Sequence, residues 1–306
     1  MLEEESYLEK VNRRQSTVIA ALKINNQIII RILIFILCSF LYIGIHYISV
    51  EKGAHDIQTK YINSFVSYIM YGSFGVSFIG LIFLLLITLS PKISDKFDKL
   101  KFKVKKNLFT VLDWAALLPI CAVIASFFFC FIFSLGQVDG TSMAPNFANE
   151  DTVFISYLDK VDRSDVVVAY ITIEDSVIAD SATNRSKYPE YYIKRVIGLP
   201  GDTVTWSKGV LTINGEVFDE SAYFDEETLE SFRNSMGFWD FDGQFKYKND
   251  SGKIIETTVI PEGYYFVMGD NRTNSTDSRN IGLVKAKNII GVVKWRFTNS
   301  GIKKVK

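Results

Sequence analysis

The chain has 306 residues and a formal net charge of zero at pH 7, so its overall composition gives no indication of nucleic-acid binding. The average conceals two different parts, because roughly the first 136 residues are dominated by apolar runs and the rest is mixed and mildly acidic. All 3 cysteines and both histidines lie in the first part. The second part therefore has no disulfide, catalytic thiolate or histidine of its own.

Three apolar segments are long enough to cross a bilayer, which takes about 20 residues of helix. They cover approximately residues 32–50, 65–90 and 114–135. Buried helices of a soluble protein are usually shorter and carry a polar face. A cleaved signal peptide does not fit either, because a long polar stretch precedes the first segment and no small-residue cleavage site follows it. We therefore expect residues 1–136 to form a membrane anchor with three transmembrane helices.

The lysines between these segments predict the orientation of the anchor. The loop between the first two segments has only Lys52 and Lys60. The loop between the second and third carries Lys92, Lys96, Lys99, Lys101, Lys103, Lys105 and Lys106. Because lysine and arginine accumulate on the cytoplasmic side, we expect a multi-pass plasma-membrane protein with a cytoplasmic N-terminus and an extracytoplasmic second part. We interpret the lysine run as this topology signal rather than as a specific lipid-headgroup site.

The second part has the pattern of a β domain. Short runs rich in valine, isoleucine, threonine and aromatic residues alternate with glycine, aspartate, asparagine and proline, which is typical of strands joined by turns. Asn214-Gly215 between two apolar runs is a strong hairpin signal. Residues 221–232 are compatible with a short helix. We expect a single mostly-β domain over residues 137–306, which is large enough to have its own core.

The residue types present in this domain limit the chemistry it can perform. A Ser-His-Asp triad, a cysteine nucleophile and a zinc site built on histidine or cysteine all require residues that it lacks. An aspartic dyad, a carboxylate-metal site, and a serine or threonine activated by lysine remain. The paired Asp-Thr/Ser-Gly signatures typical of aspartic dyads are not found. Three local motifs favour the lysine option.

These motifs are GTSMAP at 140–145, YIKRVIGLPGD at 192–202 and GDNRTNSTDSR at 269–279. A lysine acts as a general base only when neutral, and its ordinary pKa of about 10.4 leaves almost all of it protonated at pH 7. Apolar burial can lower that pKa far enough. Lys194 lies on a predicted strand, where it and Arg195 point to opposite faces. One of them can therefore be buried while the other is solvated, which is the geometry that a buried basic residue needs.

Together the motifs resemble the signature boxes of bacterial type I signal peptidases, in the Gram-positive-like branch. A further acidic box of that family matches DVVV at 165–168. The resemblance covers nearly the whole second part and implies a fold of coiled antiparallel sheets. It also implies a membrane-bound serine endopeptidase with a Ser/Lys dyad, which removes signal peptides from exported preproteins after Ala-x-Ala-like sequences.

The resemblance assigns roles to individual residues. Ser142 would be the nucleophile, Lys194 the general base, and the backbone N–H of Ser142 an oxyanion donor. Ser275 would hydrogen-bond the lysine amine and orient it. Asp277 and Arg279 would form a supporting ion pair, which is also an ordinary feature of a turn.

Other positions would contact the substrate or modify the site. Val138, Met143, Tyr192 and Ile193 match residues that line shallow pockets for small side chains, although plain core packing would explain them equally. The sequence departs from the usual boxes in three places, which are Gly140, Ser164 and Asn146. Gly140 supports the oxyanion hole without the side-chain donor that some relatives place there, Ser164 replaces a usual glycine, and Asn146 stands where threonine is common.

We expect three kinds of partner, namely signal peptides of secreted preproteins, the lipid bilayer and, as a further candidate, the secretion translocase. No nucleic acid, cofactor or metal is expected. Only 6 residues separate Leu135 from Ser142, which would keep the nucleophile close to the membrane surface. Two alternatives stay open. One is a specialised signal peptidase with a restricted substrate set, and the other is a catalytically silent, membrane-tethered β module that binds partners.

Overall fold

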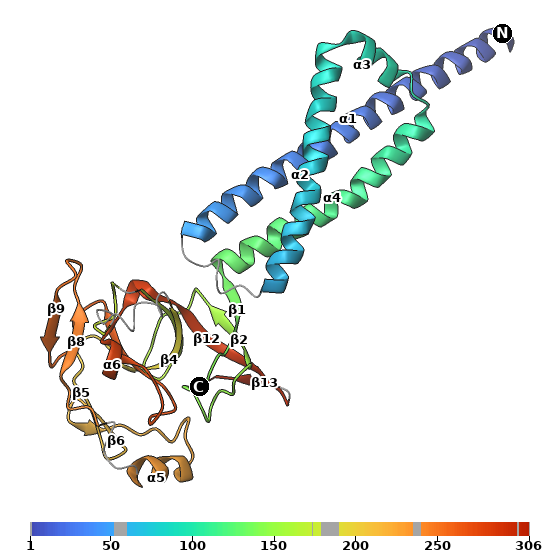
Figure 1. Cartoon of the computed structure of the whole chain (residues 1–306). Coiled ribbons are helices and arrows are strands. Elements are labelled where there is room, and N and C mark those ends of the chain that lie inside the picture. Colours follow the sequence, from blue (N-terminus) through green and yellow to red (C-terminus); the bar gives the residue numbers. More distant parts are fainter. Residues whose placement is uncertain are drawn as a thin grey trace. The chain divides into compact units, whose positions relative to one another are not determined.

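The structure is a computed structural model that describes residues 2–51, 60–172, 174–178, 190–234, 240–298 and 300–305. The chain divides into two compact units, Met1–Cys130 and Phe131–Lys306. The first is helical and the second consists mostly of strands (Figure 1). This division falls before the boundary expected at residue 136, because the residues that follow the last long helix already belong to a sheet.

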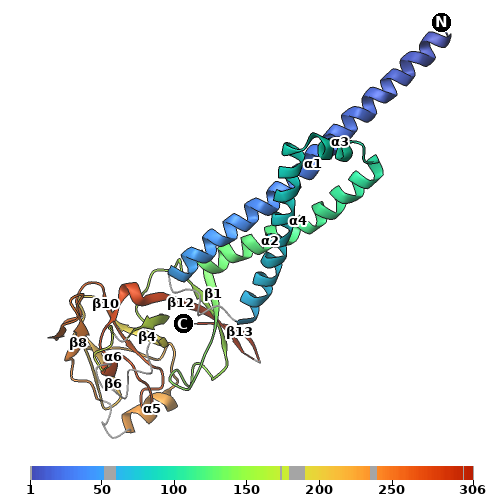
Figure 2. The same cartoon turned by 45° about the horizontal axis from the view of Figure 1, so that its top comes forward.

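The helical unit contains α1 (Leu2–Glu51), α2 (Lys60–Leu89), α3 (Pro91–Asp98) and α4 (Phe102–Phe131). Three of its helices contain stretches long and apolar enough to cross a membrane, Leu22–Ile45, Tyr68–Leu89 and Phe102–Phe131. These helices include most of the three predicted segments. In both views α1, α2 and α4 lie side by side, and the N-terminal part of α1 extends beyond the other two (Figure 1, Figure 2).

Small and hydroxyl side chains hold α1 against α2. Ser39 Oγ shares a hydrogen bond with Ser77 Oγ at 2.9 Å, and all three serines of the cluster, with Ser73, are buried. One turn further along α2, a Cβ added to Gly80 would lie 2.5 Å from Ile32 Cγ2. Small residues at such a crossing let two backbones approach, and hydroxyls pair where no water is available.

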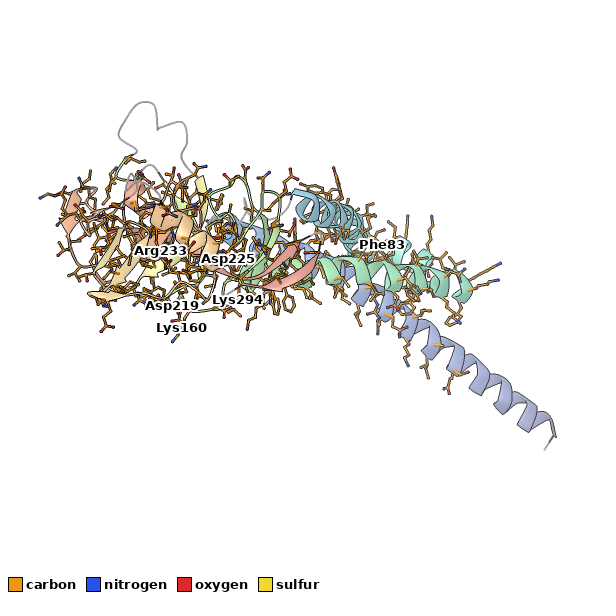
Figure 3. The ribbon with its side chains drawn as sticks, turned by 90° about the horizontal axis from the view of Figure 1, so that it is seen from below. Phe83, Lys160, Asp219, Asp225, Arg233 and Lys294 are labelled. Carbon is orange, nitrogen blue, oxygen red and sulfur yellow. The ribbon has the colours of Figure 1, made fainter. Side chains whose placement is uncertain are left out.

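A charged pair connects α1 to α4. Arg31 lies inside the apolar stretch of α1, and its Nε donates to Asp113 Oδ1 at 2.6 Å. Charged residues within an apolar helix are usually paired in this way, because an isolated charge there is costly. Aromatic residues of the unit also pack together: Phe83 of α2, labelled in Figure 3, meets Phe97 of α3 edge-on with ring centroids 5.2 Å apart.

The lysine-rich loop is folded rather than extended. Ser90 ends α2 and precedes Pro91, the first residue of α3, where a missing N–H has no cost. Lys105 is 1% exposed, and its Nζ donates to Asp98 O at 3.2 Å, at the C-terminal end of α3. The other six lysines of the run are exposed. Lys105 therefore has a structural role that the sequence pattern did not indicate.

The third apolar helix ends earlier than expected. α4 stops at Phe131, and β1 (Phe133–Gln137) follows at once. β1 pairs antiparallel with β2 (Thr152–Ser156), and the Phe133 ring stacks on Phe154 with centroids 4.9 Å apart. Leu135, which was expected at the end of a helix, is therefore a strand residue, because backbone pairing with β2 outweighs the helical continuation.

The second unit is organised around one large antiparallel sheet. Its strand order is β1-β2-β12-β3-β4-β10-β11, and β13 pairs with β12. The strands not yet given are β3 (Val166–Ile171), β4 (Glu190–Gly198), β10 (Tyr264–Met268), β11 (Val284–Lys285), β12 (Ile289–Thr298) and β13 (Gly301–Lys304). Register shifts interrupt β12 opposite both β2 and β3, and such bulges bend and twist a strand. The mostly-β fold with antiparallel sheets is confirmed.

Two smaller sheets and short helices complete the unit. The small sheets are formed by β5 (Val204–Ser207), β6 (Val210–Ile213) and β7 (Glu216–Val217), and by β8 (Phe245–Lys248) and β9 (Ile254–Thr257). The helices are α5 (Glu226–Asn234), α6 (Ser278–Ile281) and the 3-10 turn η2 (Ala286–Asn288). Asn214 and Gly215 connect β6 to β7 with φ of 52° and 83°, which confirms the predicted hairpin. α5 begins later than the helix predicted over 221–232.

Both faces of the strand β4 are covered by apolar side chains. Val196 belongs to a cluster with Val167, Val267 and Val292, whereas Ile197 belongs to a second cluster around Trp206 and Phe266. β4 lies between β3 and β10, in the interior of the large sheet. The side chains of residues 194–197 in this strand are therefore shielded from water whichever face they occupy.

Candidate active site

The serine of the first motif lies on a tight turn. Residues 140–147 form successive turns after β1, with Ala144 N donating to Thr141 O and Phe147 N to Met143 O. The turn begins at Gly140, whose φ of +87° favours glycine. Gly140 N donates to Asn149 Oδ1 at 2.7 Å. Ser142 is partly exposed on this turn.

The lysine of the second motif reaches the same serine from β4. Lys194 is opposite Val167 of β3 and is only 4% exposed. Its Nζ donates to Ser142 Oγ at 2.8 Å and to Ile193 O at 2.9 Å, and it lies 5.3 Å from the centre of the Tyr192 ring. Residues far apart in the sequence thus bring a hydroxyl and a shielded amine within hydrogen-bond distance.

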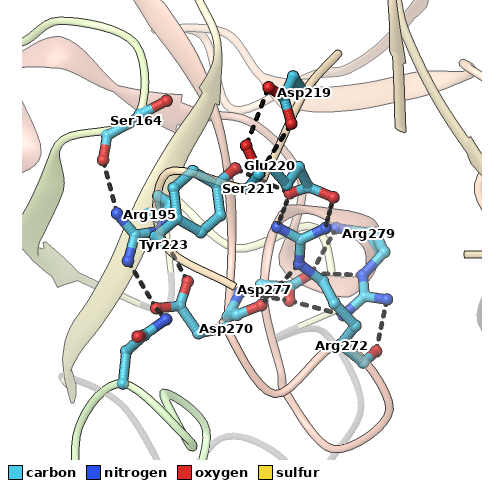
Figure 4. A network of polar contacts seen from close by, with 12 residues as sticks. Ser164, Arg195, Asp219, Glu220, Ser221, Tyr223, Asp270, Arg272, Asp277 and Arg279 are labelled. Carbon is cyan, nitrogen blue, oxygen red and sulfur yellow. Dashed lines mark hydrogen bonds and ion pairs between the residues drawn. The ribbon is translucent and has the colours of Figure 1, made fainter. Parts of the chain in front are cut away.

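Lys194 and Arg195 are both buried, so the arrangement in which one of them is buried and the other solvated is not found. Arg195 is 1% exposed, and it makes two hydrogen bonds to the Asp270 carboxylate, from Nε at 2.8 Å and from Nη2 at 2.7 Å (Figure 4). Tyr223 covers the guanidinium, whose Cζ lies 4.0 Å from the ring centre. The periodicity argument assumed that one face of β4 is open, whereas both are covered, so Arg195 requires a buried counter-ion.

The third motif contains the expected ion pair. Asp277 is fully buried, and its two carboxylate oxygens accept hydrogen bonds from Arg279 Nε at 2.9 Å and Nη2 at 2.8 Å. Gly269 N also donates to Asp277 Oδ2 at 2.9 Å. Burial by itself raises the pKa of Asp277, but these hydrogen bonds and the Arg279 charge outweigh it, so the pKa lies below its ordinary value. Asp277 is therefore ionised near neutral pH.

Ser275 does not make the expected hydrogen bond. Its hydroxyl is buried, and among the described residues it has no hydrogen-bond partner, the Lys194 amine included. It packs against Gly269, where an added Cβ would lie 2.1 Å from Ser275 Oγ and 2.5 Å from Ser142 O. In this structure the Lys194 amine donates to Ser142 Oγ and to the Ile193 carbonyl.

A second buried ion pair, between Arg272 and Glu220, lies beside the pair of Arg195 and Asp270. The sequence analysis did not identify its acidic residue. Arg272 is fully buried and forms a bidentate pair with Glu220, which precedes α5 (Figure 4). Burial raises the pKa of Tyr223, as does the Glu220 charge, so the hydroxyl stays protonated and donates to Glu220 Oε1 at 2.8 Å. Glu220 and Tyr223 belong to no motif. The only available indication of these residues was that a buried arginine needs a carboxylate partner.

Three of the four predicted pocket residues are buried in the described structure. Val138, Met143 and Tyr192 are 3%, 0% and 8% exposed, and Tyr192 packs in the cluster around Val196. Ile193 is partly exposed. The packing interpretation thus accounts for these side chains as well as the pocket interpretation does.

The backbone N–H groups of Gly140 and Ser142 differ in whether they are available to an oxyanion. The N–H of Gly140 is engaged with Asn149. Within the part of the chain that the structure describes, the N–H of Ser142 has no recorded acceptor, whereas its carbonyl accepts from Asn271 N at 3.0 Å. The backbone donor next to the hydroxyl is therefore free to bind a developing negative charge.

A serine hydroxyl 2.8 Å from a shielded lysine amine defines a class of protein, the serine hydrolases that use lysine where others use histidine. Residues 111–298, more than half of the chain, match the family model described as signal peptidase, peptidase S26. The chain belongs to this signal peptidase family. Its activity is that of a serine peptidase that removes signal peptides.

Individual relatives agree with this assignment. Signal peptidase I S of Bacillus subtilis is 36% identical over 193 residues, which cover 61% of this chain and 89% of the relative. Signal peptidase I of Streptococcus pneumoniae is 32% identical over 202 residues, covering 60% and 91%. A crystal structure of a signal peptidase I from Enterococcus faecalis is 27% identical and covers 44% of this chain and 97% of its own, but its TM-score of 0.29 adds nothing about the fold.

Proposed function

We propose that Ser142 is the nucleophile and Lys194 the general base of this signal peptidase. The observation that carries the proposal is the 2.8 Å distance between Ser142 Oγ and a lysine amine that is 4% exposed. Shielding from water disfavours the charged ammonium and so favours the neutral amine that a base requires. Among the described residues, no group of three or more His, Cys, Asp and Glu side chains is placed to hold a metal ion.

The reaction follows from these positions. The neutral Lys194 amine accepts the proton of Ser142 Oγ as the oxygen attacks the peptide carbonyl. The backbone N–H of Ser142 donates to the resulting oxyanion. The lysine ammonium then gives its proton to the departing amine of the mature protein, which leaves an acyl-enzyme. A water molecule, deprotonated by the same amine, attacks the ester and releases the signal peptide.

The resemblance supports a specificity for small side chains, as in Ala-x-Ala-like sites. In this proposal the buried Val138, Met143 and Tyr192 and the partly exposed Ile193 form the floor of a site that would admit only small side chains. A restricted set of preproteins is compatible with the same residues. A silent binding module is not favoured, because the chain belongs to a family of peptidases.

The helical unit indicates association with a membrane, and we infer a multi-pass anchor in the plasma membrane. Six exposed lysines, four between α2 and α4 and two in the first turns of α4, support a cytoplasmic loop there, with a cytoplasmic N-terminus and an extracytoplasmic catalytic unit. Signal peptides keep their apolar segment in the same bilayer, so anchoring raises the effective concentration of enzyme and substrate. A secretion translocase in that membrane would deliver the preproteins.

A cleavage assay tests the catalytic assignment. One purified preprotein is incubated with the wild type and with Ser142→Ala, and the products are separated on a gel and weighed by mass spectrometry. The wild type should cut after a small residue, and Ser142→Ala should fold but show no cleavage, because it lacks the attacking oxygen. Retention of more than a few per cent of the activity would contradict the assignment of Ser142.

Cysteine labelling tests the orientation. The native Cys38, Cys121 and Cys130 are first replaced by serine. A cysteine at the exposed position of Lys101 should be shielded from a membrane-impermeant thiol reagent in intact cells, and one at the exposed position of Lys253 should react. The reverse pattern would invert the proposed topology.

A further inference from the structure

The catalytic distance depends on two segments that meet only through tertiary contacts. Ser142 lies on the turn after β1, and Lys194 lies in β4. The hydrogen bond between them cannot hold this geometry alone, because the Ser142 oxygen must leave the amine to attack a substrate. Other contacts must therefore fix the turn against the strand, and the loop after β10 supplies them.

Asp270 contacts both segments. Its carboxylate is fully buried and accepts two hydrogen bonds from Arg195, the residue next to Lys194 in β4. The same carboxylate accepts a third hydrogen bond from Asn146 Nδ2, at 2.8 Å from Oδ2. Asn146 lies at the far end of the turn that carries Ser142. One buried charge thus joins the strand of the base to the turn of the nucleophile.

The next residue of the same loop holds the near end of the turn. Asn271 N donates to Ser142 O at 3.0 Å, and its side-chain Nδ2 donates to Thr141 O at 3.2 Å. The turn is therefore attached at both ends to adjacent residues of one loop. The near end is attached mainly through backbone groups, whereas at the far end the attachment is the Asn146 side chain.

We propose that Asn146 is a positioning residue for the Ser142–Lys194 pair, acting through Asp270 and Arg195. This inference rests on the proposed function. Asn146 is uncharged and is not itself a proton donor or acceptor in the reaction. Its amide fixes the turn by a hydrogen bond to an ionised, buried carboxylate, the stronger kind of side-chain hydrogen bond. Any residue that keeps a donor in this place keeps the alignment.

Two substitutions whose side chains have nearly the same shape as each other separate the effect of the donor from the effect of shape. Asn146→Thr keeps a hydroxyl donor and Asn146→Val replaces it with a methyl group. The control is Asn214→Gly. Asn214 Nδ2 also donates to a carboxylate, Asp202, at 2.8 Å, and Asp202 is paired with Arg163 at 2.9 Å. Glycine accepts the φ of 52° at this position, so the control removes the same kind of contact without strain, together with the hydrogen bond that Asn214 Oδ1 accepts from Thr203 N at 2.9 Å.

The measurements are kcat and KM for one preprotein with the full-length protein, and the melting temperature of each variant. Asn146→Val should lower kcat about tenfold or more and leave KM within about twofold, since it misaligns the reacting groups rather than the binding surface. Asn146→Thr should stay within about threefold of the wild-type kcat. Asn214→Gly should lower the melting temperature and leave kcat unchanged.

The proposal would be overturned if Asn146→Val and Asn146→Thr had equal kcat, if the loss appeared in KM, or if Asn214→Gly lost as much kcat. Failure of Asn146→Val to fold would also overturn it, because the residue would then serve the fold. A failure of the proposed function is recognised separately, since cleavage by Ser142→Ala would disprove it whatever the Asn146 variants do.

Discussion

Replacement of Lys194 by arginine tests the base most directly. A general base contributes about 10²- to 10⁴-fold to a rate, which corresponds to about 3–5 kcal/mol. Arginine keeps the positive charge but stays protonated at any tolerable pH. Because Lys194 is 4% exposed, no water layer around its amine can provide a substitute base. Lys194→Arg should therefore lose at least about 10²-fold in kcat and fall close to Lys194→Ala.

The assay is cleavage of one preprotein over a range of pH, with each variant checked for folding by intrinsic fluorescence. The wild type should show activity that rises with pH as the amine loses its proton, and both substitutions should remove this limb. Lys194→His should keep a trace of activity, because imidazole is a neutral base but too short to reach the same point. Near-normal turnover by Lys194→Arg would refute proton abstraction by this residue and require the dyad to be withdrawn.

Three further substitutions test the buried polar groups around the pair. Ser275→Ala should reduce kcat less than Lys194→Ala and should not lower the melting temperature, because its hydroxyl has no partner among the described residues. Asp277→Asn should destabilise the protein by about 3 kcal/mol at pH 7. Because the folded-state pKa of Asp277 lies below its ordinary value, this difference should shrink as the pH falls below about 4, and a constant difference in denaturant titrations would contradict the charge argument. Glu220→Gln leaves the Arg272 guanidinium buried without its carboxylate, which should cost about 3–5 kcal/mol and lower the melting temperature by roughly 10 °C. A shift of only about 1 °C would show that the pair contributes little.

Local patterns predicted the elements whose signal is contained in a short stretch of sequence. Asn214-Gly215 gave the hairpin because a two-residue turn with positive φ depends on those two residues alone. The end of α4 was placed too late, because the residues around Leu135 are apolar enough for a helix and only pairing with β2 shows that they form a strand. The strand partner of Leu135, Phe154, is 19 residues away and leaves no trace in local hydropathy.

For the site, local sequence patterns predicted the motif residues but not their surroundings. The motifs identified Ser142 and Lys194, but strand alternation could say only that Lys194 and Arg195 point in opposite directions. Whether each direction leads to water depends on what covers β4, and that is decided by segments such as the one with Glu220 and Tyr223. Those two residues follow no spacing rule, since their role is fixed by where the chain returns after β7.

The position of β12 in the large sheet has a consequence for how the enzyme matures. β12 is the penultimate strand in the chain, yet it lies between β2 and β3 and joins the β1–β2 hairpin to the strands that include β4. Synthesis proceeds from the N-terminus, so the hairpin that contains Ser142 and the strand that contains Lys194 are made before the strand that joins them. Until residues 289–298 have been made, no strand joins the β1–β2 hairpin to β3 and β4. The large sheet can therefore be completed only after β12 has been made.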